Sequence, residues 1–261
     1  MVFRILKAQI TAREIFVEIL VVIPARYGSS RFEAKVLAKD TGKFLVQHTY
    51  ERALCAKSVS KVLIATDNEQ VMQACESFGA ECMMTSPLHT SGSDRIAEAV
   101  KGIEAEIIVN LQADEPEIEP EYIDYVASLL AENADADMAT LVAEFENAED
   151  IVNPNIVKAI VDTHGRAIYF SRSVIPYDRQ AGGVGNVGQY LRHLGIYAYR
   201  KDFLLEYTAL EQSFLEKSEK LEQLRAIEHG YTIITGKVAH AWQGIDTAQQ
   251  YAEFVARIKN E

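Results

Sequence analysis

Cations and hydroxyl groups gather in one loop near the start of the chain. The loop follows an apolar run and reads Ala25-Arg26-Tyr27-Gly28-Ser29-Ser30-Arg31-Phe32-Glu33-Ala34-Lys35. Glycine lets backbone N–H groups approach phosphate oxygens closely, and the charges of Arg31 and Lys35 can neutralise a departing pyrophosphate. A solvated basic loop is the alternative interpretation. The strand-end position on an acidic chain favours a polyphosphate site, for which the candidates are Arg26, Ser29, Arg31 and Lys35.

A carboxylate-bearing turn follows a later apolar run, at Gln112-Ala113-Asp114-Glu115-Pro116. Mg²⁺ prefers oxygen ligands and usually takes one or two carboxylates together with phosphate oxygens and waters. An aspartate in an ordinary turn explains this fragment equally well. A second carboxylate is available at Asp246, although that residue could instead cap the final helix.

A hydroxyl-rich segment, His89-Thr90-Ser91-Gly92-Ser93-Asp94-Arg95, precedes a predicted helix. Hydroxyls and backbone N–H groups at a helix start can receive an anion or the edge of a base. A purely structural interpretation is also available, in which Ser93 is the N-cap of the helix.

Alternating strands and helices must position these loops. Apolar runs and helical periodicity predict strands at residues 18–24, 61–66, 81–84 and 107–111, with helices at 46–56, 69–78, 93–100 and 120–133. This alternation is typical of an α/β sheet, in which ligands bind beyond the carboxyl ends of the strands. The loops after Pro24, Thr66 and Leu111 should therefore face one site.

The second half has a different pattern. Strand-like runs at residues 138–144, 157–161, 167–171 and 194–199 are only partly separated by helices, which predicts a mixed-sheet extension. Four glycines in a polar stretch predict a mobile loop or an ordinary surface connection. They are Gly182, Gly183, Gly185 and Gly188.

Composition limits the function. The net charge of −12 disfavours an extended nucleic-acid surface, so an anionic substrate must meet a local basic pocket. The three cysteines form no CxxC pair and suggest neither a disulfide framework nor a zinc site. No apolar run approaches the ~20 residues needed to cross a bilayer, and the first residues lack a secretory signal. We expect a cytoplasmic protein without membrane insertion.

At this point a family resemblance becomes specific. The segment VVIPARYGSSRFEAKVL resembles the amino-terminal signature of CMP-Kdo synthetases, IPARxxSxRLPGKPL, where Kdo is 3-deoxy-manno-octulosonate. In that family the two arginines and the lysine handle the CTP phosphates, which implies these roles for Arg26, Arg31 and Lys35. The chain departs from the pattern at Glu33-Ala34 and Val36, where the family has Pro-Gly and Pro.

Three further motifs extend the resemblance. QADEP is similar to the family's QGDEP, which implies that Asp114 binds the metal and Gln112 contacts the nucleotide. GIDT is similar to GVDTxxD, which implies Asp246 as the other metal ligand, although Gln249 and Gln250 follow here. HTSGSDR is similar to HxSGTER, a segment that lines the nucleotide pocket. By resemblance, its nucleotide-binding residues are Ser91, Gly92 and Ser93.

The sugar site is implied by the motifs YFSR, RHLGIY and LEQLR. An acidic sugar presents a carboxylate and many hydroxyls, which Arg, His, Gln and Tyr side chains can recognise. The resemblance implies sugar contacts from Arg172, His193, Tyr197, Glu222 and Gln223. Without it, Glu222 and Arg225 would form an i,i+3 pair on an exposed helix face, and Tyr197 would be a strand aromatic.

The resemblance implies a Rossmann-like α/β sheet of the nucleotide-diphospho-sugar transferase type. It also implies a Mg²⁺-dependent reaction for lipopolysaccharide synthesis, in which the anomeric hydroxyl of Kdo attacks CTP.

We expect one domain over residues 1–261, with an extension at 1–16, nucleotide binding mainly at 17–135, and sugar binding, dimerisation and the second metal ligand at 136–261. A homodimer is implied, with 167–176 as the expected interface. Alternatives are 8-amino-Kdo or sialic acid as the sugar, a changed nucleotide preference, or a non-catalytic nucleotide-sugar binding protein.

Overall fold

Strand β1 (Ile19–Ala25) is buried along almost its whole length, as its apolar sequence predicts. The computed structural model describes residues 17–28, 32–242 and 244–260. Strand β1 pairs in parallel with β2 (Lys61–Thr66) on one side and β4 (Ile107–Asn110) on the other, and β3 (Cys82–Met84) pairs in parallel with β2. The predicted parallel sheet of the first half is therefore confirmed, with shifts of one residue at some strand ends.

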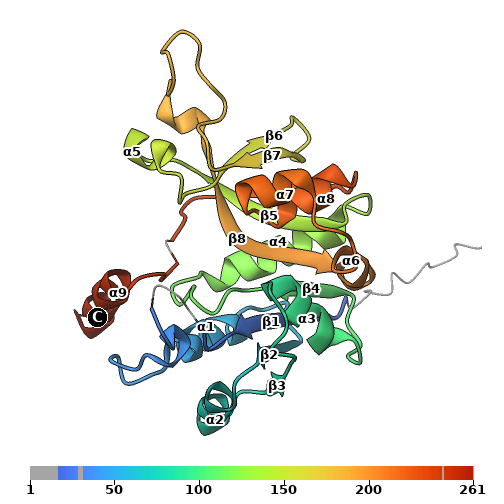
Figure 1. The fold of residues 1–261 in the computed structure, drawn as a ribbon, viewed down its shortest axis with the longest axis vertical. Coiled ribbons are helices and arrows are strands. Elements are labelled where there is room, and N and C mark those ends of the chain that lie inside the picture. Colours follow the sequence, from blue (N-terminus) through green and yellow to red (C-terminus); the bar gives the residue numbers. More distant parts are fainter. Residues whose placement is uncertain (1–16, 29–31, 243, 261) are drawn as a thin grey trace, which may run out of the picture.

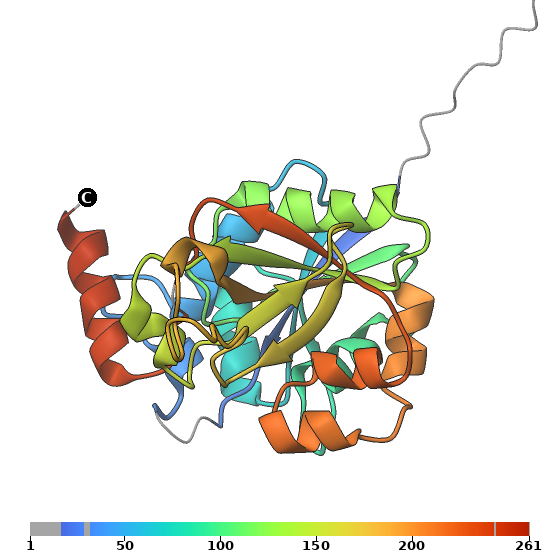
Figure 2. The same cartoon turned by 90° about the horizontal axis from the view of Figure 1, so that it is seen from above.

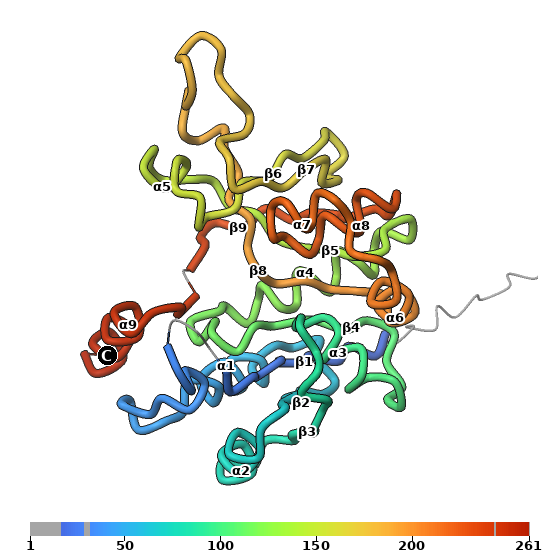
Figure 3. The backbone as a smooth tube through the Cα atoms, in the orientation of Figure 1, coloured from blue at the N-terminus to red at the C-terminus, as the bar shows by residue number. Residues whose placement is uncertain are grey.

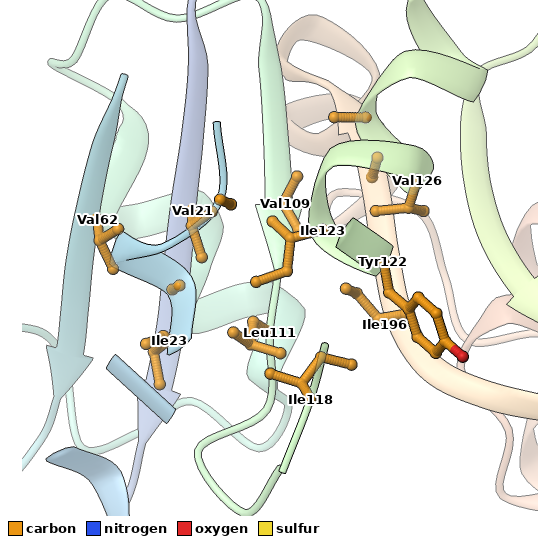
Figure 4. Close-up of a cluster of buried hydrophobic side chains, with 14 of the residues drawn as sticks. Val21, Ile23, Val62, Val109, Leu111, Ile118, Tyr122, Ile123, Val126 and Ile196 are labelled. Atoms are coloured by element: carbon orange, nitrogen blue, oxygen red, sulfur yellow. The ribbon is translucent and has the colours of Figure 1, made fainter. Parts of the chain in front are cut away.

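Helices cover both faces of this parallel sheet (Figures 1 and 2). They are α1 (Leu45–Leu54), α2 (Glu69–Ser77), α3 (Gly92–Val100) and α4 (Pro120–Glu132). Because side chains alternate between the faces of a strand, Val21 and Ile23 of β1 pack with α1, α2 and α4, whereas Leu20 and Val22 pack with α3. Figure 4 shows the first of these clusters, in which Ile123 of α4 faces the sheet.

The start of helix α3 differs from the prediction. The side chain of Ser91 accepts a hydrogen bond from the backbone N–H of Asp94 at 3.0 Å, and Ser91 has extended backbone angles. Ser91 is therefore the N-cap, and the prediction of Ser93 as the cap is wrong. Ser93 lies in the first turn of the helix with only 4% of its surface exposed, which leaves its hydroxyl for another partner.

The second half extends the sheet with antiparallel and parallel strands. Strand β8 (Leu191–Arg200) is antiparallel to both β4 and β5 (Met138–Glu144), and β9 (Ile233–Val238) is parallel to β5. The order along the described sheet is β3-β2-β1-β4-β8-β5-β9. Strands β6 (Lys158–Val161) and β7 (Ala167–Ser171) form an antiparallel pair beside the start of β8. The predicted mixed-sheet extension is confirmed.

Strand β9 was not predicted, because Thr235, Gly236 and Lys237 interrupt its apolar pattern. Gly236 has a packing reason. An added Cβ would lie 2.3 Å from the Cδ1 atom of Leu129 and 2.6 Å from the Cε1 atom of Tyr125. The glycine thus allows α4 to pack closely against this strand.

The expected dimer interface at residues 167–176 is partly covered within the chain. Phe170 of β7 is fully buried and packs in one cluster with Leu224 of α8 (Gln223–Glu228), whereas 54% of Ile168 is exposed. One face of β7 is therefore covered by α8 within the chain and is not available to a partner subunit. The homodimer itself stays a prediction.

The segment between β7 and β8 extends away from the sheet (Figures 1 and 3). Asp178 and Gly183 exchange two backbone hydrogen bonds of 2.8 and 3.0 Å, and Gly182 and Gly183 adopt positive φ at the turn. This turn explains why glycines gather here, and the mobility of the loop stays a prediction. The remaining elements are η1 (Lys35–Leu37), α5 (Ala148–Val152), η2 (Val187–Gln189), α6 (Lys201–Tyr207), α7 (Phe214–Glu219) and α9 (Ala248–Asn260).

None of the described helices combines the length and the apolar character that crossing a bilayer requires. The cysteines are present as free thiols. Cys75 is fully buried in α2, within the cluster that also holds Val71, so its side chain serves packing.

Candidate active site at the carboxyl ends of the strands

Three charged side chains from distant parts of the chain meet beyond the sheet. The Nζ atom of Lys35 lies 2.7 Å from Oδ2 of Asp114 and 3.3 Å from Oδ1 of Asp246. Only 11% of the lysine side chain is exposed, compared with 26% for Asp114 and 45% for Asp246. The predicted cation and both predicted metal-binding carboxylates are therefore brought together at one point.

Lys35 is positioned by a strained turn. Ala34 has a φ of 50° and a ψ of 26°, the left-handed conformation that favours glycine. The next three residues form η1, and Val36 is buried in the main core. The chain thus keeps at Ala34 a backbone conformation that suits the glycine of the family signature, and the lysine still reaches the two carboxylates.

Asp246 is positioned by its neighbours in the chain. The backbone N–H of Ile245 donates to the carbonyl of Asp114 at 2.9 Å, and Ile245 is buried. At Gly244 an added Cβ would lie 2.9 Å from Oε1 of Glu115. This close approach, together with the backbone hydrogen bond, brings the segment that carries Asp246 against the turn that carries Asp114.

Glu115 is a site residue that the sequence analysis did not single out. Its burial, and then the charge of Asp114, raise its pKa to about 8, with Asp246 adding to the effect while Arg192 and Lys35 oppose it. Glu115 lines a small cavity of about 80 Å³ together with Arg192, His193 and Trp242. Arg192 is the second cavity residue that the sequence did not predict. Glu115 lies in the motif QADEP next to Asp114, and Arg192 lies in the motif RHLGIY next to His193.

A second cavity, of about 180 Å³, holds most of the predicted nucleotide-contacting residues. Among its lining residues are Arg26, His89, Ser91, Gly92, Gln112 and Glu222. At Gly92 an added Cβ would lie 3.4 Å from the Cγ atom of Pro24 and 3.7 Å from Nε2 of Gln112, which is ordinary van der Waals contact with this wall. The amide of Gln112 is oriented by donating to Oδ1 of Asn110 at 2.8 Å.

Ser93 connects this cavity to the sugar motifs. Its hydroxyl donates to Oε2 of Glu222 at 2.9 Å, across 129 positions of sequence. Burial raises the pKa of the Glu222 carboxyl, while the hydrogen bond from Ser93 and the charge of Arg225 act in the opposite direction. The hydrogen bond therefore holds Glu222, a predicted sugar contact, against Ser93, a predicted nucleotide contact.

The exposed i,i+3 pair of Glu222 and Arg225 is not observed. Arg225 is buried, and its guanidinium donates two hydrogen bonds of 2.6 and 2.8 Å to the carboxylate of Glu216. Glu222 immediately precedes α8 and turns toward Ser93 instead. The interpretation of this segment as a solvated helix face is wrong, because the helix packs onto the sheet.

His193 and Tyr197 lie together on β8. Burial lowers the pKa of His193 to about 3, and its Nε2 atom lies 3.0 Å from the hydroxyl of Thr140. Its ring centroid is 5.4 Å from that of Tyr197, whose pKa burial raises well above the ordinary value. At neutral pH both groups are uncharged, which suits them to hydrogen bonding with hydroxyls of a ligand.

Gln223 is buried, with 3% of its surface exposed. Its Nε2 atom has no hydrogen-bond partner among the described residues. Buried amides are normally paired, so an unpaired one in a native structure calls for an explanation. A polar ligand at the predicted sugar site would provide that partner.

Arg172 is placed differently from the other predicted sugar contacts. Its guanidinium donates to the backbone carbonyls of Glu219 at 2.7 Å, Pro154 at 3.0 Å and Lys220 at 3.4 Å. Like Tyr197 and Gln223, it lines neither of the two cavities above, whereas His193 and Glu222 each line one. In this chain it ties β7 to the end of α7. Two other predicted residues, Ser29 and Arg31, lie outside the described residues.

The site fits a hard divalent cation. Asp114 and Asp246 supply only oxygen atoms, and both point at one positive charge, the ammonium of Lys35. No larger cluster of His, Cys, Asp or Glu suited to a metal occurs in the part of the chain that the structure describes. Two carboxylates are nevertheless the usual protein share of a Mg²⁺ site that a nucleotide completes.

The chain is similar to known proteins over most of its length. Residues 20–233 match the cytidylyltransferase family model. A 3-deoxy-manno-octulosonate cytidylyltransferase of Solibacter usitatus is 46% identical, covering 92% of this chain and 94% of its own, and one of Geobacter sulfurreducens is 43% identical, covering 92% and 99%.

Solved structures of cytidylyltransferases are also similar to this chain. A CMP:2-keto-3-deoxy-manno-octonic acid synthetase in complex with CTP superposes with a TM-score of 0.88 at 41% identity, covering 93% of this chain and 99% of its own. A 4-diphosphocytidyl-2C-methyl-D-erythritol synthase of Anaerococcus prevotii, at 13% identity and a TM-score of 0.61, shares the fold. The chain therefore belongs to the cytidylyltransferase family, among the 3-deoxy-manno-octulosonate cytidylyltransferases.

Proposed function

We propose that this chain transfers CMP from CTP to the anomeric hydroxyl of Kdo, forming CMP-Kdo and pyrophosphate for lipopolysaccharide synthesis. The convergence of Lys35, Asp114 and Asp246 beside the cavity lined by Gln112 carries this proposal. The relatives named above are 3-deoxy-manno-octulosonate cytidylyltransferases, and the structure of the similar synthetase was determined in complex with CTP.

The phosphates of CTP need positive charge on this acidic chain. Arg26 lines the cavity of about 180 Å³, and Lys35 lies nearby at the carboxylates. Preorganised cations stabilise the charge that develops in a phosphoryl-transfer transition state, because they need not reorganise during the reaction. We assign Arg26 and Lys35 to the triphosphate and, from the resemblance, Arg31 as well.

Mg²⁺ is the proposed cofactor, and Asp114 and Asp246 are the residues that would hold it. When bound, the ion supplies charge neutralisation and orientation for phosphate oxygens. Lys35 orients both carboxylates through its ammonium, and the Ile245 N–H fixes the Asp246 segment to the Asp114 carbonyl. These contacts support one compact site for both carboxylates.

Sugar recognition is proposed at His193, Tyr197, Glu222 and Gln223. His193 is neutral at physiological pH because burial lowers its pKa to about 3, so it offers a hydrogen-bond partner without a charge. Gln223 offers an amide N–H that no described protein atom accepts. A role for Arg172 in sugar binding and the homodimer remain proposals from the resemblance, and the cytoplasmic location remains a proposal from the sequence.

The decisive experiment measures pyrophosphate release by the purified protein with CTP and Mg²⁺. Kdo, 8-amino-Kdo and sialic acid are supplied separately. We expect release that depends on Kdo. Release only with 8-amino-Kdo or sialic acid would reassign the sugar, and CTP binding without release with any of the three would favour a non-catalytic nucleotide-sugar binding protein.

A further inference from the structure

Helix α9 begins at Ala248, with Thr247 between it and Asp246, and its N-terminus is closed by a reciprocal cap. Oε1 of Gln250 accepts from the backbone N–H groups of Asp246 at 2.8 Å and Thr247 at 2.9 Å. In return, the hydroxyl of Thr247 accepts from the backbone N–H of Gln250 at 3.2 Å. This is the arrangement of a capping box. The side chains of Thr247 and Gln250 each accept a hydrogen bond from the other residue's backbone N–H, which would otherwise be unpaired at the start of a helix.

The cap fixes the main chain of Asp246 itself. Asp246 is 45% exposed at its side chain, so tight packing does not by itself determine its orientation. Its backbone N–H is held by Gln250, and the preceding N–H, that of Ile245, is held by the carbonyl of Asp114. The N–H groups of Ile245 and Asp246 before the Asp246 Cα, and that of Thr247 after it, are therefore all bonded, so the main chain is held on both sides of the carboxylate.

Tyr251, the residue of α9 that follows Gln250, contacts the chain both before and after Lys35. The ring of Tyr251 lies 5.5 Å from that of Phe32, three positions before the lysine. The hydroxyl of Tyr251 accepts a hydrogen bond of 2.8 Å from the backbone N–H of Asp40, five positions after it. Tyr251 is buried with Phe254, Leu45 and Ile245 in a small separate cluster.

We infer that Gln250 and Tyr251 are positioning residues that set Asp246 in register with Lys35 and Asp114. One turn of helix carries both contacts, so a shift of α9 moves the second carboxylate and the lysine loop together. The glutamine also has a charge consequence. The family pattern GVDTxxD has an aspartate at this position, whereas Gln250 caps the helix without adding a third negative charge beside the two carboxylates. The inference rests on the proposed role of Asp246.

The matched control is the neighbouring glutamine. Gln249 lies in the same turn and is exposed, and its Nε2 atom donates to Oε1 of Glu253 at 3.1 Å. Gln249→Ala therefore removes the same number of atoms from α9 without touching the Asp246 backbone. Gln250→Glu retains an acceptor oxygen for the capping box and serves as the rescue variant.

The test compares Gln250→Ala, Gln250→Glu, Gln249→Ala and Tyr251→Phe. Mn²⁺ binding with CTP present is measured by electron paramagnetic resonance, and the Mg²⁺ dependence of pyrophosphate release is measured in parallel. Loss of one cap corresponds to about fivefold in an equilibrium, so Gln250→Ala should weaken Mn²⁺ binding and raise the Mg²⁺ requirement by about that factor. Gln250→Glu keeps the cap and adds a negative charge that favours a cation, so it should bind Mn²⁺ at least as well as the unmodified chain, and Gln249→Ala should match the unmodified chain. Tyr251→Phe should raise the KM for CTP and leave the melting temperature close to that of the unmodified chain.

The inference is overturned if Gln250→Ala and Gln249→Ala have the same Mn²⁺ affinity and Mg²⁺ dependence, because Gln250 would then serve helix stability alone. A failure of the proposed function gives a different result. In that case Asp114→Asn and Asp246→Asn would themselves bind Mn²⁺ and release pyrophosphate normally. If Gln250→Ala does not fold, Tyr251→Phe decides the question through the KM for CTP.

Discussion

The ammonium of Lys35 lies 2.7 Å from the Asp114 carboxylate, although 79 positions separate the two residues in the chain. The contact joins a turn after β1 to the turn after β4, and these two strands are neighbours in the parallel sheet. Their carboxyl ends meet at one edge, so the topology itself brings the cation and the carboxylate together. The lysine side chain is largely buried, which strengthens its interaction with the carboxylate relative to a surface pair.

Asp114→Asn should sharply reduce turnover. The change removes one of the two carboxylates proposed to hold Mg²⁺ and leaves the side chain about the same size, so kcat for pyrophosphate release should fall by a factor of about 100 or more. Glu253→Gln on the exposed face of α9 is the control for losing a carboxylate charge and should retain normal kcat. Near-normal turnover in Asp114→Asn would remove this residue from the metal site.

Ala34→Gly should stabilise the protein by up to about 1 kcal/mol. Ala34 has a φ of 50°, where a Cβ costs energy that glycine avoids, although glycine also loses more entropy on folding. At Ala38, with a φ of −60° and extended backbone, Ala38→Gly should instead destabilise by about 0.5–1 kcal/mol. Urea denaturation of both variants measures the difference, and equal destabilisation would contradict the strain at Ala34.

Much of this arrangement could be predicted from the sequence, because strand-end loops in a parallel sheet must share an edge. The apolar runs placed β1, β2 and β4, and hence the loops of Lys35 and Asp114. Strand β9 was missed because Gly236 interrupts its apolar pattern. The glycine is needed for the close packing of α4 against the strand, and nothing in the neighbouring sequence indicates that contact. Glu115 and Arg192 were missed for a related reason, since only the fold shows which residue of a motif faces a cavity.

Titration of Glu115 should lower the stability of the metal-free protein as the pH rises from about 4.5 to about 8. The pKa of Glu115 is raised in the folded protein from 4.5 to about 8 by burial and by the charge of Asp114. The unfolded chain therefore loses this proton at lower pH than the folded protein, so increasing pH favours unfolding across that interval. Glu115→Gln should flatten the profile over these pH values in denaturation without Mg²⁺. An unchanged slope in this variant would show that Glu115 does not titrate in this way.

Gln223→Leu should separate stability from sugar binding. The Nε2 atom of Gln223 is buried and has no partner among the described residues, and an unpaired buried polar group costs about 1–3 kcal/mol. Leucine has a similar volume and removes that cost, so the ligand-free variant should be as stable as the unmodified chain or up to about 1 kcal/mol more stable.

The same change removes the donor proposed for the sugar. The KM for Kdo should therefore rise by about tenfold or more, while the KM for CTP changes little, because a site built to bond a hydroxyl loses most of its discrimination when the bond is lost. Thermal unfolding and steady-state pyrophosphate release measure the two effects on one preparation. A variant that is less stable but binds Kdo normally would make Gln223 a structural residue, since only a role in packing would then remain for its buried amide.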